Sequence, residues 1–389
     1  MLTEQFLPLL SDYPCCILAV SGGSDSMALM HSVADVIATH RFEKMPSVTV
    51  ATVDHGLRPE AATEAAFVKH HANALGFEHT TLQWNPTSKA AQSVREARIG
   101  LLTTCAKEKA ATAILLGHTL DDQAETVLMR ALRSKPTSAT RGLSAISPQS
   151  IHESIVFARP LLSQSRQELR DYLTDRNTVW VDDPSNEDTA SERVRMRQRL
   201  AAEPSNLPAK VELARLATLA ERTRRWMAQQ SAALLKSALS IENEVFYLRR
   251  THHPQPVVQD VFAILTIVAG GQVRRVPRSV LLDAVQAHRT GETYRTTAGR
   301  ALISCAKDIT RFERENRAKP VPPDRKTLES HGGPLVHDGR ELYWLDQHVV
   351  HSKPFIAGLE RYRPACDDPI AHALAALHNK AYPRGASSL

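Results

Sequence analysis

The first half of the chain alternates between short apolar runs and stretches with helical periodicity. The apolar run at residues 15–20 is followed by apolar positions at Met27, Met30, Val33 and Ile37, whose spacing predicts a helix. Further strand-like runs occur at residues 47–54, 79–84, 112–117 and 154–162. Helical stretches lie between them, at residues 60–75, 88–109, 120–133 and 165–177. This alternation predicts an α/β domain with an open, doubly wound and mostly parallel sheet.

The pattern changes near Asp182. Residues 182–200 are polar and predict a loop, and residues 209–239 predict one long helix suited to linking domains. Beyond it, residues 261–271 read as a core helix and residues 301–315 as a strand pair. We therefore predict a smaller α+β C-terminal part after the linker. The expected domains are an α/β domain at 1–205, a helical linker at 206–240, an α+β domain at 241–320 and a small region at 321–389.

Composition narrows the class of protein. The hydrophobic fraction is 42% and no segment approaches the roughly 18 apolar residues of a membrane span. The N-terminus carries an acid and no cleavage pattern, so we expect a cytoplasmic protein. Its five cysteines form no CxxC pair, which argues against a zinc site or a disulfide framework. The net charge of +6, with arginine clusters at residues 193–199, 222–226 and 273–278, favours a nucleic-acid partner.

The loop after the first apolar run carries the strongest chemical signal. It reads Ser21-Gly22-Gly23-Ser24-Asp25-Ser26 and opens a helix, whose N-terminus suits a phosphate group. It lacks the lysine of a P-loop and the spacing of GxGxxG. Asp25 would repel a phosphate unless a cation lies between them, and Mg²⁺ on pyrophosphate would satisfy both. The alternative is an ordinary glycine turn capped by serine.

A second signal is the cluster of polar residues at 118–126, HTLDDQAET. In a helix over residues 120–133, Asp121 and Glu125 lie one turn apart on one face, and His118 and Asp122 have the same spacing. Such carboxylates can bind magnesium or an ammonium ion. The alternative is a set of acids that complement the helix dipole.

Several segments together resemble a known family. The SGGxDS loop is the signature of the N-type ATP pyrophosphatases of the PP-loop superfamily, whose fold is adenine nucleotide α-hydrolase-like. The segments VDHGLRPEA, GHTLDDQAET, ARPLL and DPSNEDTASERVRMR resemble, in that order, those of the lysidine synthetases. Ile99 and Val194 depart from the tyrosine and asparagine that this family prefers.

The resemblance implies that ATP, with Mg²⁺, adenylates the C2 oxygen of the wobble cytidine of tRNA(Ile) with a CAU anticodon. The amine of L-lysine then displaces AMP. The expected catalytic domain is therefore the one at 1–205, and the expected tRNA-binding domain is the one at 241–320. It implies ATP binding by Ser21, Gly22, Gly23, Ser24, Asp25 and Ser26, with Asp25 holding the metal. The catalytic candidates are Asp25, Arg95, His118, Asp121, Asp122 and Glu125. Asp121 and Glu125 are candidates for binding lysine, and Arg193, Arg195, Arg197, Arg224 and Arg225 for binding tRNA.

Two other functions stay open at this point. A related tRNA thiolase would share the ATP loop but needs paired catalytic cysteines or a cluster motif, which the cysteine positions do not supply. A non-catalytic RNA-binding protein on a decayed ligase fold would not need the intact loop and its carboxylates. The sequence leaves the oligomeric state open.

Overall fold

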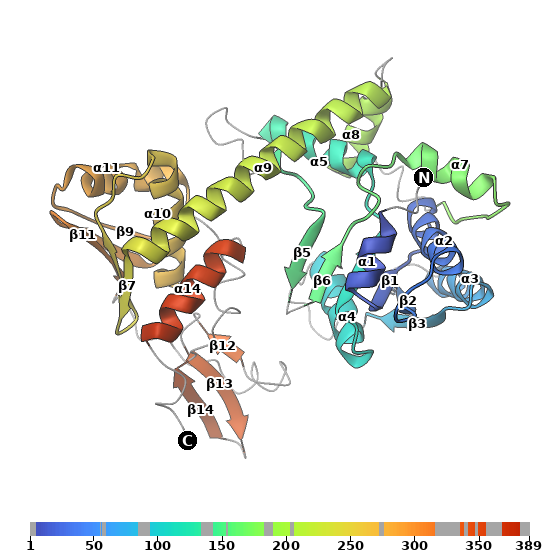
Figure 1. Cartoon of the computed structure of the whole chain (residues 1–389), viewed down its shortest axis with the longest axis horizontal. Helices are drawn as coiled ribbons and strands as arrows, with labels where there is room; N and C mark the ends of the chain where they lie inside the picture. Colours follow the sequence, from blue (N-terminus) through green and yellow to red (C-terminus); the bar gives the residue numbers. More distant parts are fainter. Residues whose placement is uncertain are drawn as a thin grey trace. The chain divides into compact units, whose positions relative to one another are not determined.

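The computed structural model describes thirteen stretches of the chain and divides into two compact units, Met1–Arg222 and Thr223–Leu389 (Figure 1). The described residues are 5–54, 56, 60–84, 94–133, 143–152, 155–182, 190–202, 206–271, 276–315, 335–337, 341–346, 349–354 and 368–381. No helix in these stretches is long and apolar enough to cross a membrane.

The first unit is built on a six-stranded sheet with the order β3-β2-β1-β4-β6-β5. The strands are β1 (Cys15–Ala19), β2 (Ser47–Asp54), β3 (Glu78–Gln83), β4 (Ala113–Leu116), β5 (Gln149–His152) and β6 (Ile155–Ala158). All pairs are parallel except β5 with β6. This confirms the predicted fold class. The edge strand β5 was not predicted, because its short polar sequence becomes a strand only by pairing with β6.

Helices cover both faces of this sheet, as the alternation within β1 requires. Cys16 and Leu18 face a core shared with the helices at Ser24–Thr39 and Ala61–Ala74, whereas Ile17 and Ala19 face a core shared with the helix at Val94–Glu108. The helices of the unit are α1 (Phe6–Asp12), α2 (Ser24–Thr39), α3 (Ala61–Ala74), α4 (Val94–Glu108), α5 (Leu120–Arg133), α7 (Arg166–Thr174) and α8 (Glu192–Ala201). The predicted helix at 120–133 is confirmed at both ends.

The strand order places a crevice at the carboxyl ends of β1 and β4. From β1 the chain adds β2 and β3 on one side, then returns to place β4 on the other side of β1. Ligands of open α/β sheets bind at such a reversal of strand order. The loop at residues 20–23 and the segment at 117–119 both begin here. At Gly117 an added Cβ would lie 3.0 Å from the carbonyl oxygen of Asp25, so β4 ends directly against the start of α2.

The helix α8 corrects one prediction. Residues 182–200 read as a loop, but Glu192–Ala201 form a helix. Two features of this polar helix follow from its packing. Val194 and Leu200 are buried. Arg193 and Arg197 lie one turn apart, and both donate hydrogen bonds to Glu125 on α5. The helix is therefore stabilised by contacts with α5 rather than by an amphipathic apolar stripe.

The second unit contains an antiparallel sheet with the order β7-β8-β11-β10-β9. Its strands are β7 (Leu239–Glu242), β8 (Val245–Arg249), β9 (Tyr294–Ala298), β10 (Ala301–Cys305) and β11 (Ile309–Arg314). The helices are α10 (Gln255–Gly270), the 3-10 helix η3 (Arg278–Leu281), α11 (Leu282–Thr290) and α14 (Asp368–Ala381), and α9 (Asn206–Ala238) ends in this unit. A further antiparallel sheet contains β12 (Leu335–His337), β13 (Glu341–Asp346) and β14 (Val349–Pro354).

The core of the second unit forms around α10, which is buried along nearly its whole length. Phe262 packs edge-on against Phe312 of β11, with ring centroids 5.0 Å apart, and against His288 of α11. The predicted core helix at 261–271 and strand pair at 301–315 are both confirmed.

Two helical glycines should respond in opposite ways to replacement by alanine. A Cβ at Gly270 would lie 1.9 Å from the carbonyl oxygen of Gly299, whereas nothing lies within 4 Å of a Cβ at Gly100. We expect Gly270→Ala to destabilise the second unit by roughly 1–3 kcal/mol through overpacking. Gly100→Ala should stabilise the first unit by about 0.5–1 kcal/mol. Thermal unfolding followed by circular dichroism measures both, and an unchanged unfolding curve for Gly270→Ala would contradict the close backbone approach.

Candidate active site

The loop between β1 and α2 is held by its own residues and by the backbone of the distant Val181. Gly22 has φ +93°, a left-handed conformation that favours glycine. The Ser26 hydroxyl donates to the carbonyl oxygen of Gly23 at 2.9 Å and accepts from the backbone N–H of Ser21 at 3.2 Å. The N–H of Val181 donates to the carbonyl oxygen of Gly22 at 2.9 Å. These contacts fix the backbone that the first turn of α2 presents.

A cavity of about 520 Å³ lies over this loop and is lined mainly by polar residues. Its lining includes Ser21, Gly23, Ser24, Asp25, Ser26, Arg98, Gly117, His118, Arg166, Arg170, Asp182 and Arg197. The N–H groups of the first helical turn lack intrahelical acceptors, and together with the helix dipole they favour an anion. The cavity therefore combines an anion-binding helix N-terminus with four arginines.

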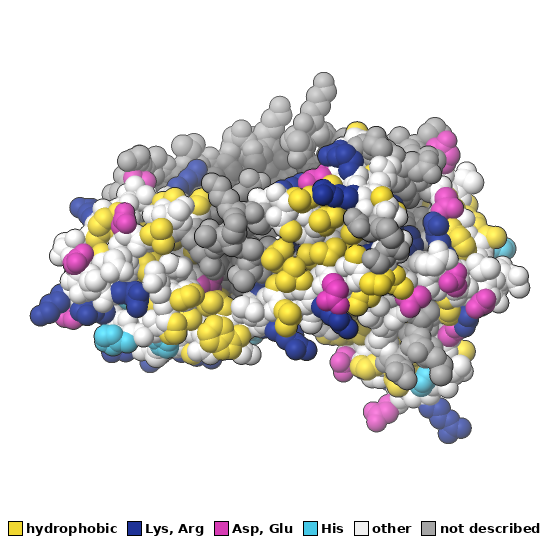
Figure 2. Space-filling model, turned by 90° about the horizontal axis from the view of Figure 1, so that it is seen from above, with side chains coloured by type: hydrophobic (Ala, Val, Ile, Leu, Met, Phe, Trp, Pro, Cys, Tyr) yellow, Lys and Arg dark blue, Asp and Glu magenta, His cyan; other side chains and the backbone are white. Residues whose placement is uncertain are grey.

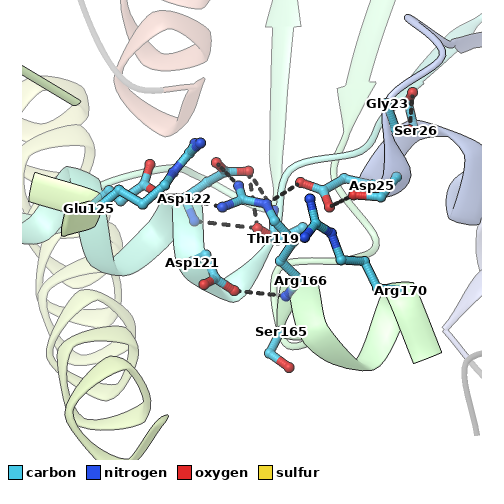
Figure 3. A network of polar contacts seen from close by, with 12 residues as sticks. Gly23, Asp25, Ser26, Thr119, Asp121, Asp122, Glu125, Ser165, Arg166 and Arg170 are labelled. Atoms are coloured by element: carbon cyan, nitrogen blue, oxygen red, sulfur yellow. Dashed lines mark hydrogen bonds and ion pairs between the residues drawn. The ribbon is translucent and has the colours of Figure 1, made fainter. Parts of the chain in front are cut away.

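Asp25 does not stand unpaired in this cavity. The Nε of Arg166, the first residue of α7, donates to Asp25 Oδ2 at 3.0 Å, and the Ser24 hydroxyl donates to Oδ1 at 3.1 Å. Figure 3 shows the Arg166 side chain between Asp25 and Asp122. Burial raises the pKa of Asp25, and the Arg166 guanidinium offsets only part of that rise.

The carboxylates of Asp122 and Glu125 share their basic partners. Glu125 is 1% exposed and accepts from Arg193 Nε at 2.7 Å and from Arg197 Nε at 2.9 Å. Asp122 accepts from Arg193 Nη2 at 2.9 Å and from Arg166 Nη2 at 3.3 Å. Its other oxygen caps α5 by accepting from the N–H of Thr119 at 2.8 Å, so the side chain is fixed in place.

Asp121 contacts a different cation. Lys210, near the start of α9, donates from Nζ to Asp121 Oδ1 at 2.7 Å, and the backbone N–H of Arg166 donates to Oδ2 at 2.8 Å. Burial raises the pKa of Asp121, but these two hydrogen bonds and the charge of Lys210 outweigh burial, and the net pKa is lowered. Asp121 is therefore ionised and already binds an ammonium group in this structure.

His118 lines the cavity as a neutral imidazole. Burial lowers its pKa to about 4, against the opposing charge of Asp122. Its Nδ1 is buried and has no hydrogen-bond partner among the described residues. At neutral pH His118 can therefore donate or accept one hydrogen bond but does not carry a charge.

The basic residues selected from the sequence occupy three kinds of position. Arg193 and Arg197 point toward the carboxylates of α5, as described above. Arg195, between them, is exposed and donates to the carbonyl oxygen of Ala190 at 2.8 Å. Arg224 is half-buried and Arg225 exposed on the part of α9 that belongs to the second unit.

Some predictions fall outside the described residues. These are the side chain of Arg95, most of the basic segment at 273–278 and Cys366.

Two residues of the charge network were missed in the sequence. Arg166 had a local signal: it occupies the first position of a helix whose Ser165–Glu168 capping box is readable as SxxE. A cation there opposes the helix dipole and needs nearby acids to be stable. Lys210 had no such signal, because its partner lies 89 residues away in the sequence.

The fold and this site define a class of protein: a PP-loop nucleotide-binding domain, with an anion-binding glycine loop and no P-loop lysine. The family model described as "PP-loop domain" matches residues 2–203, and the chain belongs to this family. ATP binding is the property that the family supports.

Relatives place the chain more narrowly, among the tRNA(Ile)-lysidine synthases. A protein of that name from a Bradyrhizobium species is 35% identical over 352 residues, covering 84% of this chain and 95% of the relative. The one from Brucella anthropi is 36% identical, covering 83% and 72%. The one from Ruegeria pomeroyi is 45% identical over 187 residues, covering 47% of this chain and 43% of the relative. The predicted family resemblance and enzyme class are confirmed.

Among solved structures, a U34-tRNA thiolase from Methanococcus maripaludis is similar with a TM-score of 0.44 and 17% identity, covering 53% of this chain and 72% of that chain.

Alanine substitutions at the two glycines of the loop should distinguish an effect on ATP binding from an effect on stability. Gly23 has φ −71°, and a Cβ there would meet nothing closer than 3.8 Å, so the chain itself tolerates alanine. We expect Gly23→Ala to change stability by less than about 0.5 kcal/mol. It should weaken ATP binding at least about tenfold, because the methyl group would project toward the phosphates that the sequence predicts at this loop.

Gly22→Ala is the matched control, since φ +93° strains alanine and should cost of order 1–3 kcal/mol. Thermal unfolding and ATP titration distinguish the two effects. Normal ATP affinity in Gly23→Ala would place the phosphates elsewhere.

Proposed function

We propose that this protein joins L-lysine to the C2 position of the wobble cytidine in a tRNA(Ile) with a CAU anticodon, converting ATP to AMP and pyrophosphate. The observation that carries the proposal is the position of the SGGSDS loop beside buried carboxylates, one of which already binds an ammonium group. The names of relatives that match most of the chain support the same reaction.

In the first step the cytidine O2 attacks the α-phosphorus of ATP, and pyrophosphate leaves. The loop and the first turn of α2 would hold the leaving pyrophosphate through backbone N–H groups and serine hydroxyls. Arg98 and Arg166 line the same cavity and can stabilise the charge that develops on the phosphates. The wobble base is unpaired in its loop and can be reached without opening a duplex.

Magnesium fits the donor set of this chain. Mg²⁺ prefers oxygen ligands and is commonly held by one or two carboxylates together with substrate phosphates. Asp25 supplies such a carboxylate beside the phosphate-binding loop, and no cluster of three or more metal-ligating side chains occurs among the described residues. When bound, the metal would neutralise phosphate charge, and Asp25 is the residue that would hold it.

In the second step the amine of lysine attacks C2 of the adenylated cytidine. The new C–N bond forms, the C2–O bond breaks, AMP leaves with the oxygen, and the amine loses a proton. Asp121 and Glu125 are the carboxylates that we propose for an ammonium group of the lysine substrate. Asp121 is paired with Lys210 and Glu125 with arginines, so lysine must displace an internal cation to bind.

The tRNA body would be bound chiefly through phosphate contacts of basic residues, which position the RNA without reading its sequence. Arg225 is exposed on α9 next to Trp226, whose side chain is 50% exposed and can stack on a base. On the face in Figure 2 the described Lys and Arg side chains are interspersed with acidic ones rather than gathered in one patch. We therefore propose that several small basic groups share the contact, with Arg195, Arg224 and Arg225 among them.

The state of three of the five cysteines disfavours a role for them as the catalytic thiols of a thiolase. Burial raises the pKa of Cys16 to about 12 and also raises the pKa of Cys105 and Cys305. Such thiols are poor nucleophiles because the thiolate is the reactive form.

The nucleotide product distinguishes this reaction class from kinase-like chemistry. With lysine, ATP and a tRNA(Ile) transcript, we expect AMP and pyrophosphate in amounts equal to that of lysidine, because the loop at residues 21–26 lacks the lysine of a P-loop. Chromatographic separation of the nucleotides measures the ratio. ADP as the main product, or AMP formed without lysine incorporation, would contradict the proposal.

Removing the internal ammonium should favour the substrate. In Lys210→Met, Asp121 keeps its hydrogen bond from Arg166 but loses its competitor, so we expect the KM for lysine to fall by about tenfold. Lys210→Arg keeps the charge and should leave KM near the wild-type value. Steady-state kinetics at saturating ATP and tRNA measure both. A raised KM in Lys210→Met would mean that substrate lysine does not use Asp121.

A further inference from the structure

Arg166 connects the phosphate-binding loop with the acidic cluster of α5. Its guanidinium contacts Asp25 at 3.0 Å through Nε, Asp122 at 3.3 Å through Nη2 and Glu125 at 3.8 Å through Nη1. Its backbone N–H is held by Asp121. The side chains of Arg166 and Asp25 are each 19% exposed, so their interaction is only weakly screened by water.

We propose that Arg166 is a positioning residue that occupies Asp25 while no metal is bound and exchanges this contact for the nucleotide phosphates when the metal–ATP complex enters. The proposal rests on the proposed function, in that it takes Asp25 as the metal-binding carboxylate. It assigns Arg166 a role that neither the sequence motifs nor the names of the relatives indicate.

The geometry permits this exchange at low cost. The contact with Asp25 uses Nε, whereas the contacts with Asp122 and Glu125 use the two terminal nitrogens. A guanidinium that leaves Asp25 therefore keeps acidic neighbours on α5. It also stays in the cavity that it lines together with Ser24 and Ser26. Asp25 in turn is never left unpaired, because a cation replaces Arg166 as it leaves.

Arg170 provides a matched control within the same helix. It lies one turn after Arg166 and lines the same cavity. It pairs instead with Asp182 at 3.1 Å and stacks on the ring of Trp180, with 5.7 Å from the guanidinium carbon to the ring centroid. Loss of Arg170 removes a positive charge from the cavity without touching Asp25.

The test is a double-mutant cycle on ATP binding by the full-length chain, with Asp25→Asn, Arg166→Gln and the double variant. ATP affinity is measured by calorimetry once with EDTA and once with excess Mg²⁺. The coupling factor is the product of the wild-type and double-variant Kd values divided by the product of the two single-variant Kd values. It reports how far the interaction between Asp25 and Arg166 changes when ATP binds.

With EDTA the pair stays intact in both states, and we expect a factor within about twofold of one. With Mg²⁺ the wild type must break the pair, and we expect a factor of about ten. Asp25→Asn combined with Arg170→Gln should give a factor near one in both conditions. A factor near one in Mg²⁺ overturns the proposal, because the pair would then be static. A factor of about ten in both conditions also overturns it, because the exchange would not depend on the metal.

If Arg166→Gln fails to fold, Arg166→Lys replaces it in the cycle. It keeps the charge but loses the fork geometry, so with Arg166→Lys in place of Arg166→Gln we expect a factor in Mg²⁺ between one and ten. A factor near one in both the Arg166→Gln and the Arg166→Lys cycles overturns the proposal. The cycle reports only nucleotide binding. Lysidine formation by the wild type tests the proposed function separately, so either result can fail while the other stands.

Discussion

The buried carboxylates at the start of α5 can exist as ions only because basic side chains from other helices neutralise them. Glu125 is nearly inaccessible to water, and an unpaired carboxylate there would cost several kcal/mol. Its partners come from α8 and α7, and those of Asp121 and Asp122 come from α7, α8 and α9. The requirement for charge balance therefore brings three helices to the start of α5, and two of them, α7 and α8, contribute arginines to the lining of the cavity.

The same balance restricts how substrates enter. In the reaction that we propose, the metal–ATP complex would meet Asp25 paired with Arg166, and an ammonium group of lysine would meet Asp121 paired with Lys210. Binding would then be an exchange of ions rather than an addition of charge to an empty pocket. An exchange keeps every buried charge paired at each stage, which avoids the cost of desolvating an isolated ion.

Local patterns accounted for most of the fold, and the exceptions share one cause. The parallel strands, α5 and α10 were predicted because their apolar periodicity is visible within a dozen residues. The edge strand β5 and the helix α8 were not, because each is polar and is stabilised by a distant partner: β6 for β5, and Glu125 for α8. The sequence of a polar segment does not show which distant segment of the chain stabilises it.

The candidate site likewise has features that the sequence predicts and features that depend on distant contacts. The sequence by itself determined the glycine loop, since a left-handed Gly22 and a serine-rich helix start are local requirements of an anion cradle, and it determined the carboxylates one turn apart on α5. Only the tertiary structure decided what those charges contact. Arg166 lies 141 residues from Asp25, and Lys210 lies 89 residues from Asp121. Ion pairs depend on distance in space and on burial, and neither is encoded in the spacing of residues along the chain.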